Sequence, residues 1–238
     1  DPSSYKSILL NSCKIMELQS AYKPFFNYER FGRLLGKDTL LLFINSMFYT
    51  EARNDIFKCF QLYRYSERYQ KFKDKIENLI AYEEAIINFF CHIIKERYPI
   101  HNIIIIGHEP ILSRRIKDKE EIATSLENPG LRFLSHIYDI FSDCNKYYLC
   151  ADVHQYQEID IQLDNKHNIK QYVVGTGGTK CDDKICPPKD VSYQESLIKN
   201  EEIKLLFKLN RCERAFGYLD ITNNQGELIF NFIKTGEC

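Results

Sequence analysis

Two short segments place metal-binding side chains at the ends of apolar, strand-like runs. His108 comes after Gly107, which ends the β-branched run of residues 101–106. Asp152 and His154 come at the end of the run 146–152. In an extended chain, the i, i+2 spacing puts Asp152 and His154 on one face, where they could share a metal ion or bind two adjacent ions. The spacing therefore makes Asp152 and His154 candidate metal ligands, and it places His108 at the end of another predicted strand.

Each of these positions also has a simpler interpretation. His108 could cap a tight turn between Gly107 and Pro110, and His154 could be a polar residue at a strand end. Asp152 could be an ordinary exposed loop residue. Arg114 lies just after the first segment and could contact an anionic substrate, or it could lie in a solvated loop.

The elements that must position these residues alternate between strands and helices. A helical pattern of apolar residues runs through 51–98 and ends before Pro99, and a second helix covers 131–141. Strands are predicted at 38–48, 101–106, 146–152, 157–163, 170–174, 203–209, 215–221 and 227–233. The turn at 224–226 joins the last two strands into a hairpin. This order predicts an α/β fold with an antiparallel section at the C-terminal end.

The order of three motifs resembles the calcineurin-like metallophosphoesterases, most closely the purple acid phosphatases. The motifs are GHEP at 107–110, ADVHQYQ at 151–157 and VVGTGG at 173–178. Residues 22–28 (YKPFFNY) with the strand 38–48 resemble an aromatic segment and strand of that family, and 215–221 resembles its closing hairpin. The series is fairly specific because it occurs in the family's order.

The resemblance implies that residues 31–238 are the C-terminal part of a metallophosphoesterase-like domain, preceded by an irregular segment at 1–30. The implied architecture is part of a four-layer α-β-β-α sandwich with a C-terminal antiparallel hairpin. It also implies a two-metal site for Fe, Zn or Mn, to which His108 and His154 would contribute. The family's first histidine of the second motif is replaced by Asp152, and its glycine by Ala151. A carboxylate still suits a hard cation.

The family's earlier motifs, Asp-x-His, Gly-Asn-His-Asp and Gly-Asp-x-x-Asp, are absent before residue 108. We therefore expect this chain alone to be inactive. One hypothesis is that the chain, which begins with Asp1 rather than Met, is a partial product whose N-terminal half or partner subunit completes a hydrolase of phosphate esters. The alternative is a catalytically inactive scaffold or assembly component that has lost its metals.

Charge, hydrophobicity and cysteine content bear on whether the protein binds nucleic acid, crosses a membrane or occupies an oxidising compartment. The chain has 32 Lys and Arg against 33 Asp and Glu, so no basic field predicts nucleic-acid binding. No apolar run is long enough for a membrane span. Cys181 and Cys186 are the close pair among nine cysteines and predict either a loop disulfide or a reduced pair. A disulfide there would indicate a secreted or lumenal protein.

Overall fold

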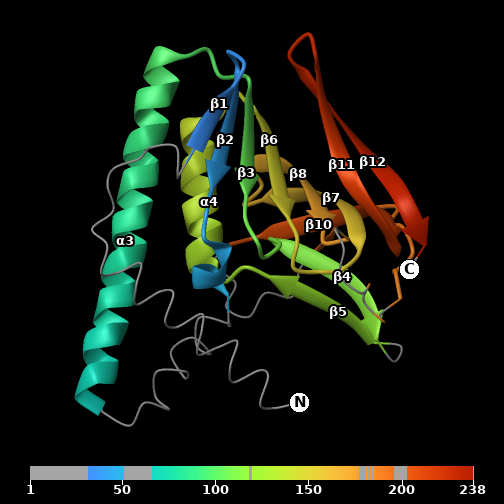
Figure 1. The fold of residues 1–238 in the computed structure, drawn as a ribbon, viewed down its shortest axis with the longest axis horizontal. Helices are drawn as coiled ribbons and strands as arrows, with labels where there is room; N and C mark the ends of the chain where they lie inside the picture. Colours follow the sequence, from blue (N-terminus) through green and yellow to red (C-terminus); the bar gives the residue numbers. More distant parts are fainter. Residues whose placement is uncertain are drawn as a thin grey trace.

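Four adjacent parallel strands form the centre of an eight-stranded sheet (Figure 1). The structure, a computed structural model, describes residues 32–50, 66–117, 120–176, 181, 183, 185–195 and 203–237. The predicted irregular segment at 1–30 lies outside these residues. The parallel strands are β2 (Thr39–Phe43), β3 (Asn102–Ile106), β6 (Asn145–Cys150) and β8 (His167–Val174).

Antiparallel strands extend this centre on both sides. β1 (Gly32–Leu35) pairs with β2 on one side. On the other side, β7 (Tyr156–Leu163), β10 (Leu205–Glu213) and the short β9 (Gln194–Glu195) follow β8 in that order. The predicted α/β class is therefore confirmed, and the central strands are buried because their Ile and Leu side chains meet a layer on each face.

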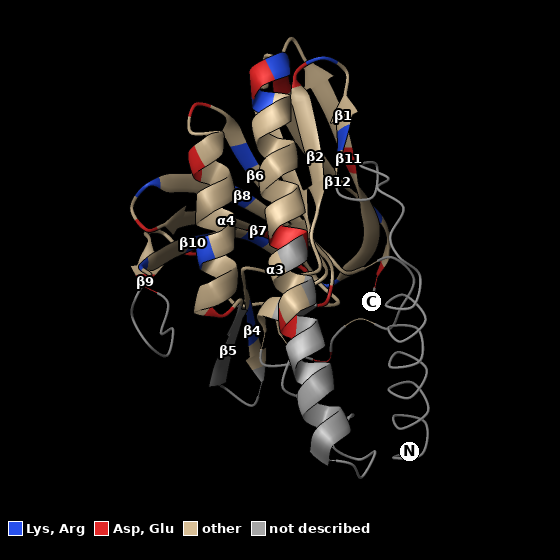
Figure 2. Cartoon of the chain, turned by 90° about the vertical axis from the view of Figure 1, so that its left-hand side faces the viewer, with Lys and Arg blue, Asp and Glu red and all other residues tan. Residues whose placement is uncertain are grey.

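Two helices cover one face of the sheet (Figure 2). α3 (Ser66–Arg97) is the long predicted helix, although residues 51–65 of that prediction lie outside the described residues. α4 (Asn128–Ile140) begins with a proline in its first turn, where no intrahelical donor is needed, and buries Leu131, Leu134 and Ile137. In the described part of the chain, no helix has the length and hydrophobicity to cross a bilayer.

A hairpin covers part of the opposite face. β11 (Ala215–Asn224) pairs with β12 (Glu227–Glu237), as predicted. Gln225 and Gly226 connect them with φ angles of 54° and 93°, the positive values that a two-residue hairpin turn requires. The ring of Phe232 stacks on Tyr156 at 4.0 Å between ring centroids. The described residues thus form three layers, with helices, sheet and hairpin in that order (Figure 1).

A second ribbon, which the sequence analysis did not predict, follows the GHEP motif. β4 (Leu112–Lys117) pairs with β5 (Glu120–Ser125) and with no strand of the main sheet. Buried glutamine side chains of the main sheet bind its backbone instead. The Gln171 amide oxygen accepts from Ile111 N at 2.8 Å and the Gln157 amide oxygen accepts from Arg114 N at 3.0 Å. Both side-chain amide nitrogens donate back to β4 carbonyls.

The strand predicted at 38–48 is shorter in the structure. β2 ends at Phe43, and a 3₁₀ turn, η2 (Ser46–Tyr49), follows it. The buried Ser46 in this turn lies beside the first motif, so the end of β2 contributes to the candidate site.

Candidate metal centre

The candidate site lies at the edge of the sheet where the parallel strands end. Because β3 and β6 are adjacent and parallel, the loops that follow them leave the sheet side by side. Backbone hydrogen bonds join the two loops: Gly107 N donates to Leu149 O, and Ala151 N donates to His108 O, both at 3.0 Å. The predicted juxtaposition of His108 and Asp152 follows from this topology.

Two buried hydroxyl groups hold the GHEP loop. Ser46 Oγ accepts hydrogen bonds from His108 N at 2.8 Å and from Glu109 N at 2.7 Å. The Tyr148 hydroxyl donates to Glu109 O at 2.8 Å. A Cβ on Gly107 would overlap the Tyr148 hydroxyl and lie 2.9 Å from Ser46 Oγ, so this position admits glycine alone without rearrangement.

Three side chains come together at this edge. One ligand atom from each of His108, Glu109 and Asp152 lies within 4.8 Å of the others. His108 Nε2 is 3.8 Å from Asp152 Oδ1, with the side chains 57% and 34% exposed. The pKa of the Glu109 carboxyl is raised, mainly by partial burial and then by the Asp152 charge, while His108 and Arg115 act in the opposite direction. The close approach of two carboxylates favours a positive charge between them.

The residues fit a divalent cation. An imidazole nitrogen and two carboxylate oxygens suit Mn²⁺, Fe²⁺ or Zn²⁺, and the partial exposure of the group leaves room for water or substrate. The hydroxyls of Ser46 and Tyr148 do not touch the cation position but hydrogen-bond to the loop that carries two of the three ligands, and so hold it in place.

His154 is not a member of this group. The prediction that it shares a face with Asp152 required an extended chain, but residues 152–155 bend, and Gln155 N donates to Val153 O at 2.8 Å. Gly175 explains the closeness of this bend to β8, because a Cβ there would overlap Val153 O. Gly177 and Gly178 of the third motif lie outside the described residues.

Arg114 does not face the candidate site. Its side chain is 5% exposed and forms a buried ion pair with Asp190. Its guanidinium also lies 5.2 Å from the centre of the Phe207 ring. The prediction that Arg114 contacts an anionic substrate is therefore wrong, because a buried, paired guanidinium cannot reach a ligand in solvent. Its role is structural.

Both alternatives for Cys181 and Cys186, a disulfide between them and a reduced pair, are wrong. Cys186 bonds to Cys212, with the two Cα atoms 5.6 Å apart, and ties the loop before β9 to β10. Cys181 is also disulfide-bonded, but not to Cys186. The close spacing of Cys181 and Cys186 in the sequence could not indicate Cys212, which lies 26 residues after Cys186 and is brought close by β10.

The sequence analysis also missed Glu109 and Ser46. Glu109 lies within the GHEP motif, and a carboxylate adjacent to a predicted ligand was the signal that could have identified it. Ser46 is distant in sequence from the motif, so its role depends on the β2–β3 pairing. No protein-family model matches the chain, and neither a curated protein nor a solved structure shows significant similarity to it.

Proposed function

We propose that this chain is the metal-binding C-terminal part of a phosphoric ester hydrolase of the calcineurin-like, purple-acid-phosphatase type. The observation that carries the proposal is the meeting of His108, Glu109 and Asp152 on loops from two adjacent parallel strands. Two of these residues belong to the motifs that resemble the family. On this proposal the three described layers are part of a four-layer sandwich.

Within the site, His108, Glu109 and Asp152 would hold the cation. A bound divalent cation would supply Lewis-acid stabilisation of charge on a phosphoryl oxygen. The protein residues keep the ligands in place: Ser46 fixes the His108–Glu109 backbone, and Gly175 lets the Asp152 loop pack against β8. His154 would act only after a change in its loop.

The site in this chain is incomplete for two metals. Three ligands serve one cation, whereas a two-metal site that clamps both the attacking and the leaving oxygen needs further ligands. We propose that these come from a segment or subunit outside this chain, and we expect the chain alone not to hydrolyse phosphate esters. Reading the complete gene tests this part: absence of Asp-x-His and Gly-Asn-His-Asp upstream would overturn it.

The second candidate is an inactive scaffold on the same fold. Its support is the replacement of the family's glycine and histidine by Ala151 and Asp152, together with the lack of the early motifs. Fold alone does not establish activity. Stoichiometric metal together with hydrolysis of an aryl phosphate would rule this candidate out.

Calorimetric titration with Mn²⁺ and Zn²⁺ tests the site directly. We expect binding of one cation, lost in Asp152→Asn and Glu109→Gln and retained in Asp220→Asn, whose carboxylate is exposed on the hairpin. We also expect inorganic phosphate to bind only when the metal is present. Failure of the wild-type chain to bind either cation, or equal loss in the Asp220 control, would refute the proposal.

We propose a secreted or lumenal location for the protein. The Cys186–Cys212 disulfide supports it, because such bonds persist in oxidising compartments. Mass spectrometry after thiol alkylation of protein from its native source tests this: alkylation of both cysteines before reduction would contradict it.

A further inference from the structure

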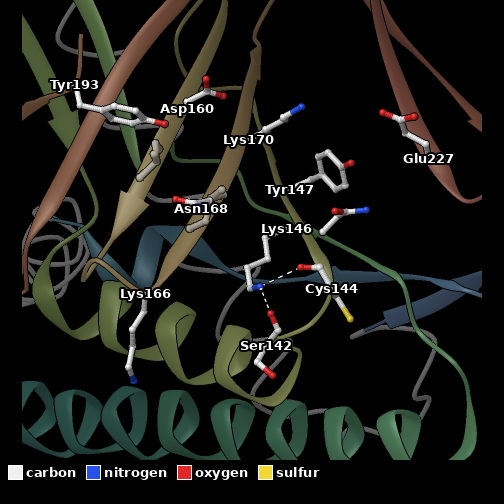
Figure 3. A pocket seen from close by; sticks show the side chains of 13 residues that line it. Ser142, Cys144, Lys146, Tyr147, Asp160, Lys166, Asn168, Lys170, Tyr193 and Glu227 are labelled. Carbon is white, nitrogen blue, oxygen red and sulfur yellow. Dashed lines mark hydrogen bonds between the residues drawn. The ribbon is translucent and has the colours of Figure 1, made fainter.

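A hollow of about 530 Å³ lies at the end of the sheet where β6 begins (Figure 3). It opens near the start of β6, whereas Asp152 follows the end of that strand, so the two sites are roughly 20 Å apart. Its volume falls in the range of small-molecule sites in proteins.

Its floor is a row of side chains across three strands. Tyr147 of β6 is the register partner of Lys170 of β8, and Lys170 is the register partner of Asp160 of β7. Register partners share a face of the sheet, so a phenol, an ammonium and a carboxylate lie next to one another. Asn168 adds a side-chain amide (Figure 3).

Two segments flank this row of side chains, and hydrogen bonds to the main sheet hold each of them in place. Glu227, at the start of β12, forms one wall, and Asn102 Nδ2 holds the adjacent turn by donating to Gly226 O at 3.0 Å. Tyr193 forms the other wall. Its loop is held by Asp190, whose carboxylate accepts from Leu209 N at 2.9 Å. Hydrogen bonds within the protein therefore fix the segments on both sides of the hollow.

The charges around the hollow limit what it can bind. Lys146 donates to Ser142 O and Cys144 O, and Lys166 lies 3.3 Å from Asp139, so both amines have partners in the protein. Asp160 and Glu227 oppose a strongly anionic ligand, and Lys170 opposes a strongly cationic one.

We propose that this hollow binds a neutral, polyhydroxylated ligand, namely a short oligosaccharide. Sugar hydroxyls both donate and accept hydrogen bonds. In the hollow, Lys170 donates, Asp160 accepts and the Asn168 amide does both, so each can pair with a hydroxyl. Tyr193 is 42% exposed, and its ring offers an apolar surface to the C–H face of a pyranose ring.

Saturation-transfer NMR and calorimetry on the 238-residue chain test the proposal, using cello-, malto-, manno- and chito-oligosaccharides of three to five units. At about 10 mM ligand, even millimolar affinity is detectable. Glycylglycine, inorganic phosphate and spermidine serve as zwitterionic, anionic and cationic comparisons. We expect at least one oligosaccharide to bind and the three comparisons not to.

Tyr193→Ala should weaken that binding at least about fivefold. Tyr218→Ala is the matched control, since Tyr218 is 54% exposed on the hairpin and does not line the hollow; it should leave affinity unchanged. If Tyr193→Ala fails to fold, shift mapping on the wild type should place the largest changes at Lys170 and Asn168. The inference is overturned by absence of oligosaccharide binding, by preference for a comparison ligand, by equal effects of the two variants, or by shift changes elsewhere.

Discussion

Replacing Ser46 with alanine should release the loop that carries His108 and Glu109. The Ser46 hydroxyl is fully buried and accepts from both backbone amides of that loop. Its removal leaves two N–H donors without this partner, and each unpaired buried donor costs about 1–3 kcal/mol. The two amides are only partly buried, so the lower half of that range applies to each, and the expected loss of unfolding free energy for the two together is about 2–4 kcal/mol.

Urea unfolding in metal-free buffer measures this loss, and Mn²⁺ titration of the same variant measures its effect on the site. We expect weaker Mn²⁺ binding, because the loop's ligands are no longer held in place. Ser142→Ala is the control: Ser142 is exposed, so its stability should stay within about 0.5 kcal/mol of the wild type. A loss below about 1 kcal/mol for Ser46→Ala, or an equal loss for Ser142→Ala, would show that this hydroxyl does not hold the loop.

Three further predictions, for Gly175, Arg114 and His167, are tested by urea unfolding of substituted chains. Gly175→Ala should cost about 1–3 kcal/mol because its Cβ would overlap a carbonyl oxygen, whereas Gly236→Ala, with its closest atom 3.7 Å away, should have little effect. Arg114→Leu should cost about 3–5 kcal/mol by leaving Asp190 buried without its ion-pair partner, and Asp190→Leu in the same chain should recover part of that loss; no recovery would argue against the pair. Burial lowers the pKa of His167 below its ordinary value of 6.5, so its contribution to stability is present above pH 6.5 and is lost as the pH falls toward the folded-state pKa. His167→Gln should therefore flatten the dependence of unfolding free energy on pH between 5 and 7, and an unchanged slope would refute the assignment.

The central strands and both helices could be predicted from the sequence because their signals are local. The isoleucine run before Gly107 reads as a buried strand, and β3 begins and ends within one residue of the prediction. α4 was predicted about three residues late at its start, since the helix includes Asn128, Pro129 and Gly130. Proline in a first helical turn was a usable signal for that start.

The β4–β5 ribbon could not be predicted in the same way. β4 carries serine and two arginines in its middle, so its composition resembles an exposed loop. Its strand geometry depends on Gln157 and Gln171, which lie 43 and 60 residues after the backbone amides that they bind. A pattern within one segment has no information about partners at that separation.

The candidate site was predicted in part. His108 and Asp152 meet because β3 and β6 are parallel neighbours, which the strand-loop pattern indicated. His154 was included because an extended backbone was assumed, and the bend after β6 removes it from the group. Arg114 was assigned either to a substrate contact or to a solvated loop, and neither holds because its partner Asp190 lies in a loop that only the fold brings close.

The glutamine side chains that bind β4 make this ribbon a separate unit for hydrogen exchange. The amide protons of Ile111, Leu112 and Arg114 are held by side chains and not by a neighbouring strand. They can exchange with solvent when the two glutamine amides rotate away, without unfolding of the main sheet. We therefore expect their exchange rates to report local opening of the segment next to His108 and Glu109 and not global unfolding of the protein.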